Sequence, residues 1–138
     1  MILLDTNIIS ELMKSAPDAR LITWIDAREP WQLYTSATTV AEITYGISVL
    51  PEGKRRKQIE ESWAECLRQG FSGMVLPFTK EAAEIYGVLM ADRKRLGRPV
   101  SMADGQIAAI AKLNNATLAT RNTKDFSDFD IRLVNPLI

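Results

Sequence analysis

A chain of 138 residues with 46% hydrophobic and 25% charged residues has the size and composition of one globular domain with its own core, and not of a disordered chain. It contains no histidine, which excludes Ser-His-Asp hydrolysis, Cys-His proteolysis and histidine-ligated zinc or iron sites. Seventeen basic and seventeen acidic residues give a net charge of zero, so any attraction to nucleic acid must be local.

The first half of the chain predicts two short strands and three helices. In chain order these are a strand over residues 1–4, a helix over 8–14, a helix from Asp18 to before Pro30, a strand over 32–36 and a helix from Thr38 to before Pro51. The first strand is entirely apolar, which is typical of a strand buried on both faces. In the second helix, Leu21, Trp24 and Ile25 recur at helical spacing and indicate one apolar face.

The second half continues the alternation of helices and strands. In chain order we expect a helix over residues 54–69 ended by Gly70, a strand over 74–78, a helix from Thr79 to before Gly97, a helix from Ser101 to about Asn114, a strand over 116–120, a short segment over 124–129 and a weak strand over 132–134. This alternation indicates a parallel sheet with helices on both faces. We therefore expect residues 1–138 to form a single domain with a three-layer α/β/α fold around a mainly parallel sheet of four to five strands.

Targeting signals are not expected in this sequence. Asp5 interrupts the first apolar run after four residues, which leaves neither the basic start nor the apolar stretch of a secretion signal. No apolar stretch approaches the roughly 20 residues needed to span a membrane. A single cysteine, Cys66, cannot form an internal disulfide and fits a reducing compartment. We therefore expect a cytoplasmic protein that makes no contact with a membrane.

Asp5 is the first candidate site residue. It follows the first apolar strand, and ligands of open parallel sheets bind outside the carboxyl ends of the strands. Aspartate is also a good N-cap, so a purely structural role at the start of the next helix explains Asp5 alone equally well. A functional site is therefore indicated only if further acids lie at the same edge of the sheet.

Glu42 and Asp104 are the other candidates, and each lies near the start of a helix. Glu42 follows Thr39 by three residues and fits a capping box. It is also the only acid in the stretch 31–51, which favours a partly desolvated carboxylate. Asp104 follows Ser101 by three residues, and the alanine-rich helix after it indicates a buried helix start whose carboxylate faces a cleft.

Three carboxylates that converge at one edge of a sheet repel one another and raise each other's pKa values unless a cation joins them. Mg²⁺ suits this set, because it is a hard ion that one or two carboxylates hold together with waters and substrate phosphate. Such a site activates a water and stabilises the charge of an in-line phosphoryl displacement. We therefore expect Mg²⁺, with Mn²⁺ as a substitute, at a site formed by Asp5, Glu42 and Asp104.

Several short motifs, spread over essentially the whole chain, resemble a known family. They are Leu4-Asp5-Thr6-Asn7, Ala41-Glu42, Ser101-Met102-Ala103-Asp104 before an alanine-rich helix, and Ala119-Thr120-Arg121-Asn122 followed by Asp125-Phe126. Their order and spacing resemble the PIN domain, and within it the VapC-like and FitB-like ribonuclease toxins of bacterial type II toxin–antitoxin systems. The resemblance implies a magnesium-dependent endoribonuclease that cleaves RNA phosphodiester bonds.

The resemblance also implies roles for individual residues. The catalytic acids of the metal site correspond to Asp5, Glu42 and Asp104, and Asp5 and Asp104 correspond to its direct ligands. Thr6 corresponds to a supporting hydroxyl beside the first acid. The family often has a fourth acid after the last core strand, where this sequence has Asn122. Either Asp125 takes that catalytic role or the site has three acids, which leaves open how many metal ions bind.

The basic residues offer several surfaces for contacts. Compact positive runs at residues 54–57 and 93–98 fit solvated helix ends, although either could bind phosphates or face an antitoxin. Arg121, directly after the fourth strand, is the better candidate for contacting the substrate. The resemblance implies three partners: an RNA substrate, a cognate antitoxin that lays a segment over the active cleft, and a second copy in a homodimer. Large apolar residues around 21–25 and 59–67 also favour a dimer, because they exceed what a small monomer is expected to bury.

Two alternatives deserve comparison with this hypothesis. A haloacid-dehalogenase-like phosphatase also uses an aspartate after its first strand, but it needs a second aspartate two residues later, where this sequence has Asn7. A non-catalytic PIN-fold module that binds nucleic acid or a partner would be expected to have lost at least one of the three acids. All three are present, which favours the nuclease.

Overall fold

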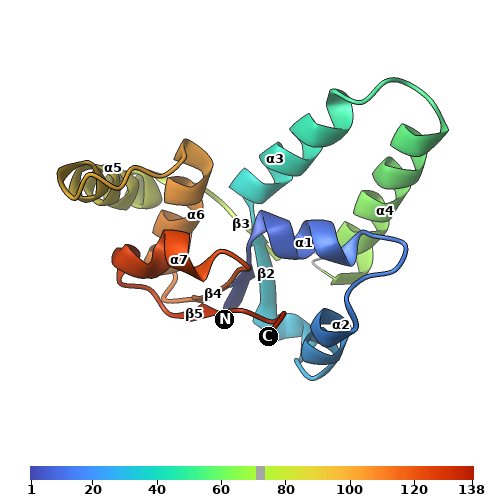
Figure 1. The fold of residues 1–138 in the computed structure, drawn as a ribbon, viewed down its shortest axis with the longest axis horizontal. Helices are drawn as coiled ribbons and strands as arrows, with labels where there is room; N and C mark the ends of the chain where they lie inside the picture. The colour runs from blue at the N-terminus through green and yellow to red at the C-terminus, as the bar shows by residue number, and fades with distance from the viewer. Residues whose placement is uncertain (71–73) are drawn as a thin grey trace.

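The computed structural model describes residues 1–70 and 74–138, and the strands in this part of the chain form one parallel sheet in the order β3-β2-β1-β4-β5 (Figure 1). The strands are β1 (Ile2–Leu4), β2 (Leu33–Ser36), β3 (Val75–Leu76), β4 (Thr117–Ala119) and β5 (Leu133–Val134). Strand β1 pairs with β2 on one side and with β4 on the other, so the first strand is the central one. The expected parallel sheet is confirmed, with five strands.

Helices cover both faces of this sheet, as expected for a three-layer fold (Figure 1). They are α1 (Thr6–Leu12), α2 (Ala19–Asp26), α3 (Ala37–Ser48), α4 (Lys54–Gly70), α5 (Lys80–Arg95), α6 (Met102–Leu113) and α7 (Thr123–Phe126), with 3-10 turns η1 (Pro30–Gln32) and η2 (Ser127–Phe129). Helices α1 to α4 contribute to one apolar cluster, and α5 to α7 contribute to the other. In the described part of the chain, no helix has the length and apolar character needed to cross a membrane.

The alternation of side chains along the central strands explains the two clusters. Leu3 packs with α5 and α6, whereas its neighbour Leu4 packs with α1, α3 and α4. Leu118 and Ala119 on β4 divide in the same way. Because successive residues of a strand point to opposite faces, an unbroken apolar run supplies both layers of the core. This arrangement leaves the residue after β1, Asp5, at the edge of the sheet between the two layers.

Two helices begin earlier than the sequence pattern predicted, and only α3 has a cap other than the expected one. Helix α1 begins at Thr6, since the Oδ1 of Asp5 accepts a hydrogen bond from the backbone N–H of Thr6 at 2.8 Å. Helix α3 begins at Ala37, since the Oγ of Ser36 accepts from the backbone N–H of Thr39 at 3.0 Å. Thr39 is therefore inside the helix, and the predicted capping box with Glu42 does not form.

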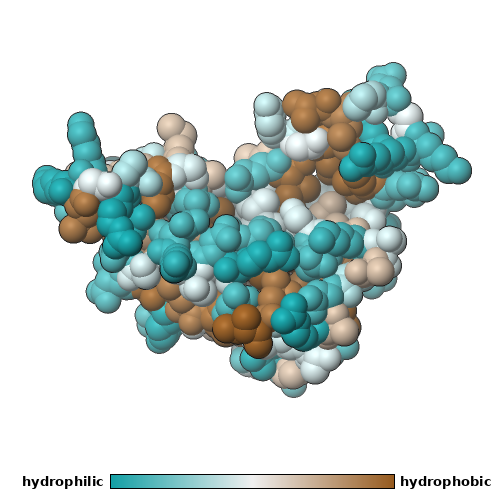
Figure 2. Space-filling model, in the orientation of Figure 1, coloured by the Kyte–Doolittle hydropathy of each residue, from teal (hydrophilic) through white to brown (hydrophobic). Residues whose placement is uncertain are grey.

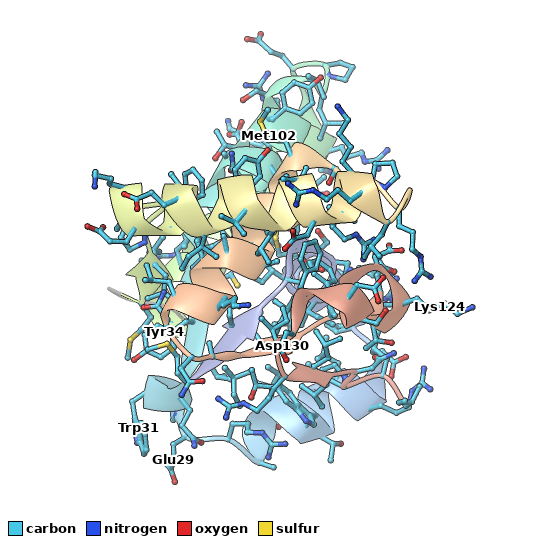
Figure 3. All side chains as sticks on the ribbon, turned by 90° about the vertical axis from the view of Figure 1, so that its left-hand side faces the viewer. Glu29, Trp31, Tyr34, Met102, Lys124 and Asp130 are labelled. Atoms are coloured by element: carbon cyan, nitrogen blue, oxygen red, sulfur yellow. The ribbon has the colours of Figure 1, made fainter. Side chains whose placement is uncertain are left out.

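Helix α6 lies close against α5, and a glycine makes this contact possible. A Cβ atom at Gly105 would lie 2.5 Å from Met90 Sδ and 2.8 Å from Tyr86 Cε2. Figure 3, viewed from the side of α5, shows this helix lying across α6. The tight crossing fixes the first turn of α6, which carries Asp104.

The large apolar residues that suggested a dimer are mostly covered within the chain itself. Leu21 is fully buried, and Trp63 on α4 is 7% exposed. Trp24, Ile25, Ile59, Cys66 and Leu67 pack against the same cluster. Ile22 is the exposed large apolar residue of the stretch 21–25, and more strongly exposed ones lie elsewhere: Tyr45 on α3, Val49 directly after it, Val88 on α5 and Met102 on α6. The predicted surplus on residues 21–25 and 59–67 was therefore largely wrong, because α2 and α4 use most of these residues for the second layer of the core.

Candidate active site

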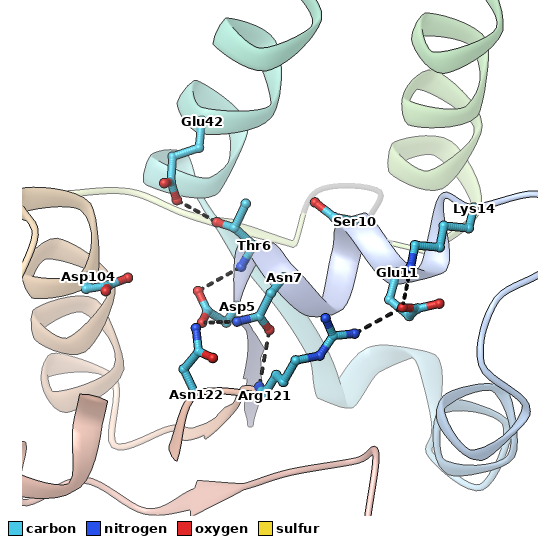
Figure 4. A pocket seen from close by; sticks show the side chains of 10 residues that line it. All are labelled: Asp5, Thr6, Asn7, Ser10, Glu11, Lys14, Glu42, Asp104, Arg121 and Asn122. Carbon is cyan, nitrogen blue, oxygen red and sulfur yellow. Dashed lines mark hydrogen bonds and ion pairs between the residues drawn. The ribbon is translucent and has the colours of Figure 1, made fainter. Parts of the chain in front are cut away.

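A pocket opens at the carboxyl edge of the sheet, where β1 passes into α1 (Figure 4). Its lining combines acids, bases and neutral polar residues: Asp5, Thr6, Asn7, Ser10, Glu11, Lys14, Glu42, Asp104, Arg121 and Asn122. Asp5 lies between β1 and α1, and the other lining residues come from α1 and the turn after it, from α3, from α6 and from the segment after β4. In the space-filling view, hydrophilic residues run across the middle of this face, below the notch between α5 and α6 on one side and α3 and α4 on the other (Figure 2).

Asp5 is the most deeply placed carboxylate of the pocket, with 3% of its surface exposed. Its Oδ1 accepts from the backbone N–H of Thr6, and its Oδ2 accepts from Thr120 Oγ1 at 2.7 Å and from Asn7 Nδ2 at 3.2 Å. These donors belong to α1 and to the segment after β4. Asp5 is therefore both the cap of α1 and a fixed carboxylate in the pocket, so the structural and functional interpretations are compatible.

The surroundings of Asp5 make its charged form costly. Burial raises the pKa of Asp5 to about 6, from an ordinary value of 3.8. The negative charges of Asp104 and Glu42 raise it as well, whereas the hydrogen bonds from Thr120 and Thr6 lower it in part. The three predicted acids therefore interact electrostatically across the pocket.

Glu42 reaches the pocket from the first half of α3. Thr6 Oγ1 donates to Glu42 Oε1 at 2.6 Å, and Thr6 Oγ1 also lies 3.0 Å from Thr39 Oγ1. The Thr6 hydroxyl thus joins α1 to α3 and fixes the position of the Glu42 carboxylate. Glu42 is exposed, so the partial desolvation expected from its apolar neighbours was wrong. These neighbours include Ile43, which turns into the core while Glu42 faces solvent.

Asp104 is the third residue of α6 and lies on the same side of the pocket as Glu42 in Figure 4. Its backbone N–H donates to Ser101 Oγ at 3.1 Å, so the helix cap uses the main chain of Asp104. Its carboxylate is half-buried, and burial raises its pKa, with further contributions from the charges of Glu42 and Asp125. The Ser101 hydroxyl lowers this pKa in part, so Ser101 interacts with the side chain of Asp104 as well as with its backbone.

The donor set of this pocket fits a hard, hydrated cation better than a closed metal cage. Within residues 1–70 and 74–138, no three acidic or cysteine side chains stand close enough together to enclose an ion directly. The three carboxylates nevertheless face one pocket and disfavour one another's charge. A cation relieves this repulsion, and Mg²⁺ normally keeps several waters and binds only one or two carboxylates directly.

Asn122 follows β4 at the position where the sequence resemblance implied a fourth acid. Asn122 lines the pocket. Asp125 is exposed on α7 and is not among the lining residues, although its charge raises the pKa of Asp104. Arg121 lines the pocket, and its backbone N–H donates to Asn7 Oδ1 at 3.2 Å. Neither basic run at 54–57 or 93–98 contributes to this lining.

Four lining residues were given no site role by the sequence reasoning: Asn7, Ser10, Glu11 and Lys14. Glu11 is the most informative, because it is 6% exposed although it is an acid. A signal was available, since Asn7 and Glu11 are four residues apart and share one face of the short helix α1. That face continues the edge of the sheet on which Asp5 was predicted to act.

Comparison with known proteins places this chain in a family. The family model described as PIN domain matches residues 2–131. The VapC ribonuclease Y4jK of Sinorhizobium fredii is 42% identical over 136 residues, which is 99% of this chain and 97% of that protein. Toxin FitB of Neisseria gonorrhoeae is 39% identical over 136 residues, which is 99% of this chain and 98% of that protein.

A solved structure shows the same relationship in three dimensions. The structure of FitAB bound to an IR36 DNA fragment contains a chain that is 38% identical to this one. The two chains superpose with a TM-score of 0.90, covering 100% of this chain and 96% of the other. Sequence and fold agree over almost the full length, and the chain therefore belongs to the PIN-domain family, in the group that includes the VapC and FitB proteins.

Proposed function

We propose that residues 1–138 act as one domain, a magnesium-dependent endoribonuclease that is the toxin of a type II toxin–antitoxin system. The observation that carries this proposal is the meeting of Asp5, Glu42 and Asp104 in one pocket beside Arg121. The names of two relatives, VapC ribonuclease and toxin FitB, support the same activity. The retained acids favour this function over that of a non-catalytic PIN-fold module.

Asp5 and Asp104 are the residues that would hold Mg²⁺ or Mn²⁺. When bound, such a cation supplies positive charge and an activated water for hydrolysis of a phosphodiester. Thr120 and Asn7 orient the Asp5 carboxylate for this role by donating to its Oδ2. The bond from Thr6 leaves Glu42 Oε2 available to orient the attacking water and to accept its proton. We assign catalysis to these three acids and assign Asp125 only an electrostatic influence on Asp104.

A cleavage assay with Asp5→Asn tests this proposal. The wild-type protein is expected to cleave single-stranded RNA with Mg²⁺ or Mn²⁺ and to be inactive in excess chelator, because its carboxylate ligands suit hard cations. Asp5→Asn is expected to lose activity by orders of magnitude at saturating Mg²⁺. Asp130→Asn makes the same chemical change at an exposed acid outside the pocket and should retain full activity. Full cleavage by the wild type in chelator would contradict the metal-dependent mechanism.

The proposal includes two protein partners, a cognate antitoxin that covers the pocket and a second copy of this chain. Exposed Tyr45 on α3, Val49 directly after α3, Val88 on α5 and Met102 on α6 offer apolar surface for a homodimer. In Figure 3, Met102 lies at the opposite end of the molecule from Trp31. We expect a dimer in sedimentation at micromolar concentration, and Val88→Lys is expected to weaken it. A monomeric wild type would contradict this part of the proposal.

A further inference from the structure

Glu11, a buried acid of the pocket, forms ion pairs with two basic side chains at the pocket rim. Glu11 Oε1 accepts from Lys14 Nζ at 2.9 Å and from Arg121 Nη2 at 3.0 Å, and its Oε2 accepts from the backbone N–H of Asp18 at 3.1 Å. Figure 4 shows the two basic side chains converging on this carboxylate. The hydrogen bond from Lys14 keeps the pKa of Glu11 below its ordinary value, with smaller contributions from the bonds made by Asp18 and Arg121. Glu11 is therefore a charged anchor.

The three ionic side chains differ sharply in exposure. The Glu11 side chain is 8% exposed, whereas the side chains of Lys14 and Arg121 are 61% and 48% exposed. The anchor is thus covered while both cations remain open to a ligand. In the part of the chain that the structure describes, the side chain of Arg121 makes no hydrogen bond other than the one to Glu11. Its remaining guanidinium donors are available, and guanidinium donors match the oxygens of a phosphate.

Arg121, with its remaining guanidinium donors, lines the same pocket as the three acids. Arg121 follows β4 directly, and its backbone is held by Asn7, the second residue after Asp5. The three acids of the pocket repel a phosphodiester anion, so the substrate needs fixed positive charge on another side of the same pocket. A flexible arginine supplies positive charge at no fixed position. An arginine that is hydrogen-bonded to a buried carboxylate supplies the charge at a defined position.

We propose that Glu11 is a positioning residue that holds the Arg121 guanidinium at the rim of the pocket, where it receives a phosphate of the RNA substrate. This inference rests on the proposed ribonuclease function. Glu11 itself touches neither the substrate nor a metal ion. Its effect on cleavage is transmitted through Arg121, and Lys14 offsets the remaining negative charge of the anchor.

The change Glu11→Gln is expected to affect RNA binding and kcat differently, because it removes a charge and also releases Arg121. Loss of one negative charge makes the pocket more positive, so RNA binding is expected to stay within about threefold of wild type or to tighten. Loss of the anchor releases Arg121, and misplacement of a substrate-orienting group lowers kcat by about tenfold to a hundredfold. The expected signature is therefore a lower kcat with retained affinity, measured for cleavage in Mg²⁺ and for binding of an RNA oligonucleotide in chelator.

The matched control is Glu84→Gln on α5, which removes one carboxylate from the exposed Lys80–Glu84 ion pair outside the pocket. It makes the same change in net charge and is expected to leave kcat unchanged. A double-mutant cycle adds Arg121→Gln, alone and with Glu11→Gln. Because Glu11 acts through Arg121, the double variant should be no slower than Arg121→Gln alone.

Three outcomes would overturn the inference. They are an unchanged kcat for Glu11→Gln, multiplicative losses in the double variant, and a loss of kcat accompanied by equal loss of RNA affinity and a lower Tm, which would show a structural role. If Glu11→Gln does not fold, Arg121→Lys provides the test, because it keeps the charge but removes the guanidinium fork and should again lower kcat at retained affinity. A wild type that cleaves no RNA would instead refute the proposed function itself, and this inference with it.

Discussion

Replacing Asp104 with asparagine is expected to lower RNA cleavage by at least about a hundredfold and to leave the protein as stable as the wild type. The carboxylate of Asp104 faces the pocket, and its negative charge is the property that a metal ligand needs. The capping contact uses the backbone N–H of Asp104 and Ser101 Oγ, and asparagine retains this N–H. Removal of one of three mutually repelling charges even favours the folded state in the absence of metal.

The complementary change is Ser101→Ala, which removes the cap and keeps the carboxylate. This variant is expected to lose about 1 kcal/mol of stability, because the first turn of α6 loses its side-chain acceptor, while its kcat stays near that of the wild type. Denaturant unfolding and cleavage rates measured on both variants separate the two roles. Near wild-type turnover of Asp104→Asn at low Mg²⁺ would mean that Asp104 is only part of the helix start.

The main features of the fold were predictable because they depend on local patterns. The apolar run before Asp5 and the alternation of strands with helices indicated a strand buried on both faces in a parallel sheet. Ser101 was correctly predicted as the cap of α6. The pattern of a serine followed by an acid three residues later is recognisable from the local sequence, because these two residues contact each other in the first turn of a helix. The start of α3 was missed, since Ser36 and Thr39 are both suitable caps and only the end of β2 selects Ser36.

The candidate site was predictable only in part, because some of its contacts join distant segments. Asp5 and Asp104 occupy positions that sequence alone marks, at a strand end and at a helix start. The ion pair between Glu11 and Arg121 joins residues 110 positions apart along the chain, so no local pattern indicates this contact. The placement of Asp125 outside the pocket likewise depends on how α7 leaves the sheet.

Magnesium binding is expected to weaken about tenfold for each pH unit below about 6. The pKa of Asp5 in the metal-free protein is raised to about 6, mainly by burial, and a metal ion binds the deprotonated carboxylate. Each pH unit below that pKa lowers the ionised fraction of Asp5 about tenfold. An aspartate with the ordinary pKa of 3.8 would keep its affinity unchanged down to a much lower pH. Calorimetric titration with Mg²⁺ between pH 5 and pH 8, chosen to bracket this pKa, measures the effect.

The stability of the metal-free protein, measured in chelator, should also depend on the ionisation of Asp5, but it should fall as the pH rises, whereas Mg²⁺ binding becomes stronger. Because the folded-state pKa of Asp5 lies above its ordinary value, its contribution to stability is complete below about pH 3.8 and is lost as the pH rises through about 6. The increase in Tm caused by Mg²⁺ should therefore grow as the pH rises through about 6, the range in which the metal-free protein becomes less stable. In Asp5→Asn this pH-dependent growth should be smaller, since Asp5 no longer titrates and Asp104 is the remaining ligand with a raised pKa. An increase in Tm that is equal at pH 5 and pH 8 in the wild type would show that Asp5 does not bind the metal ion.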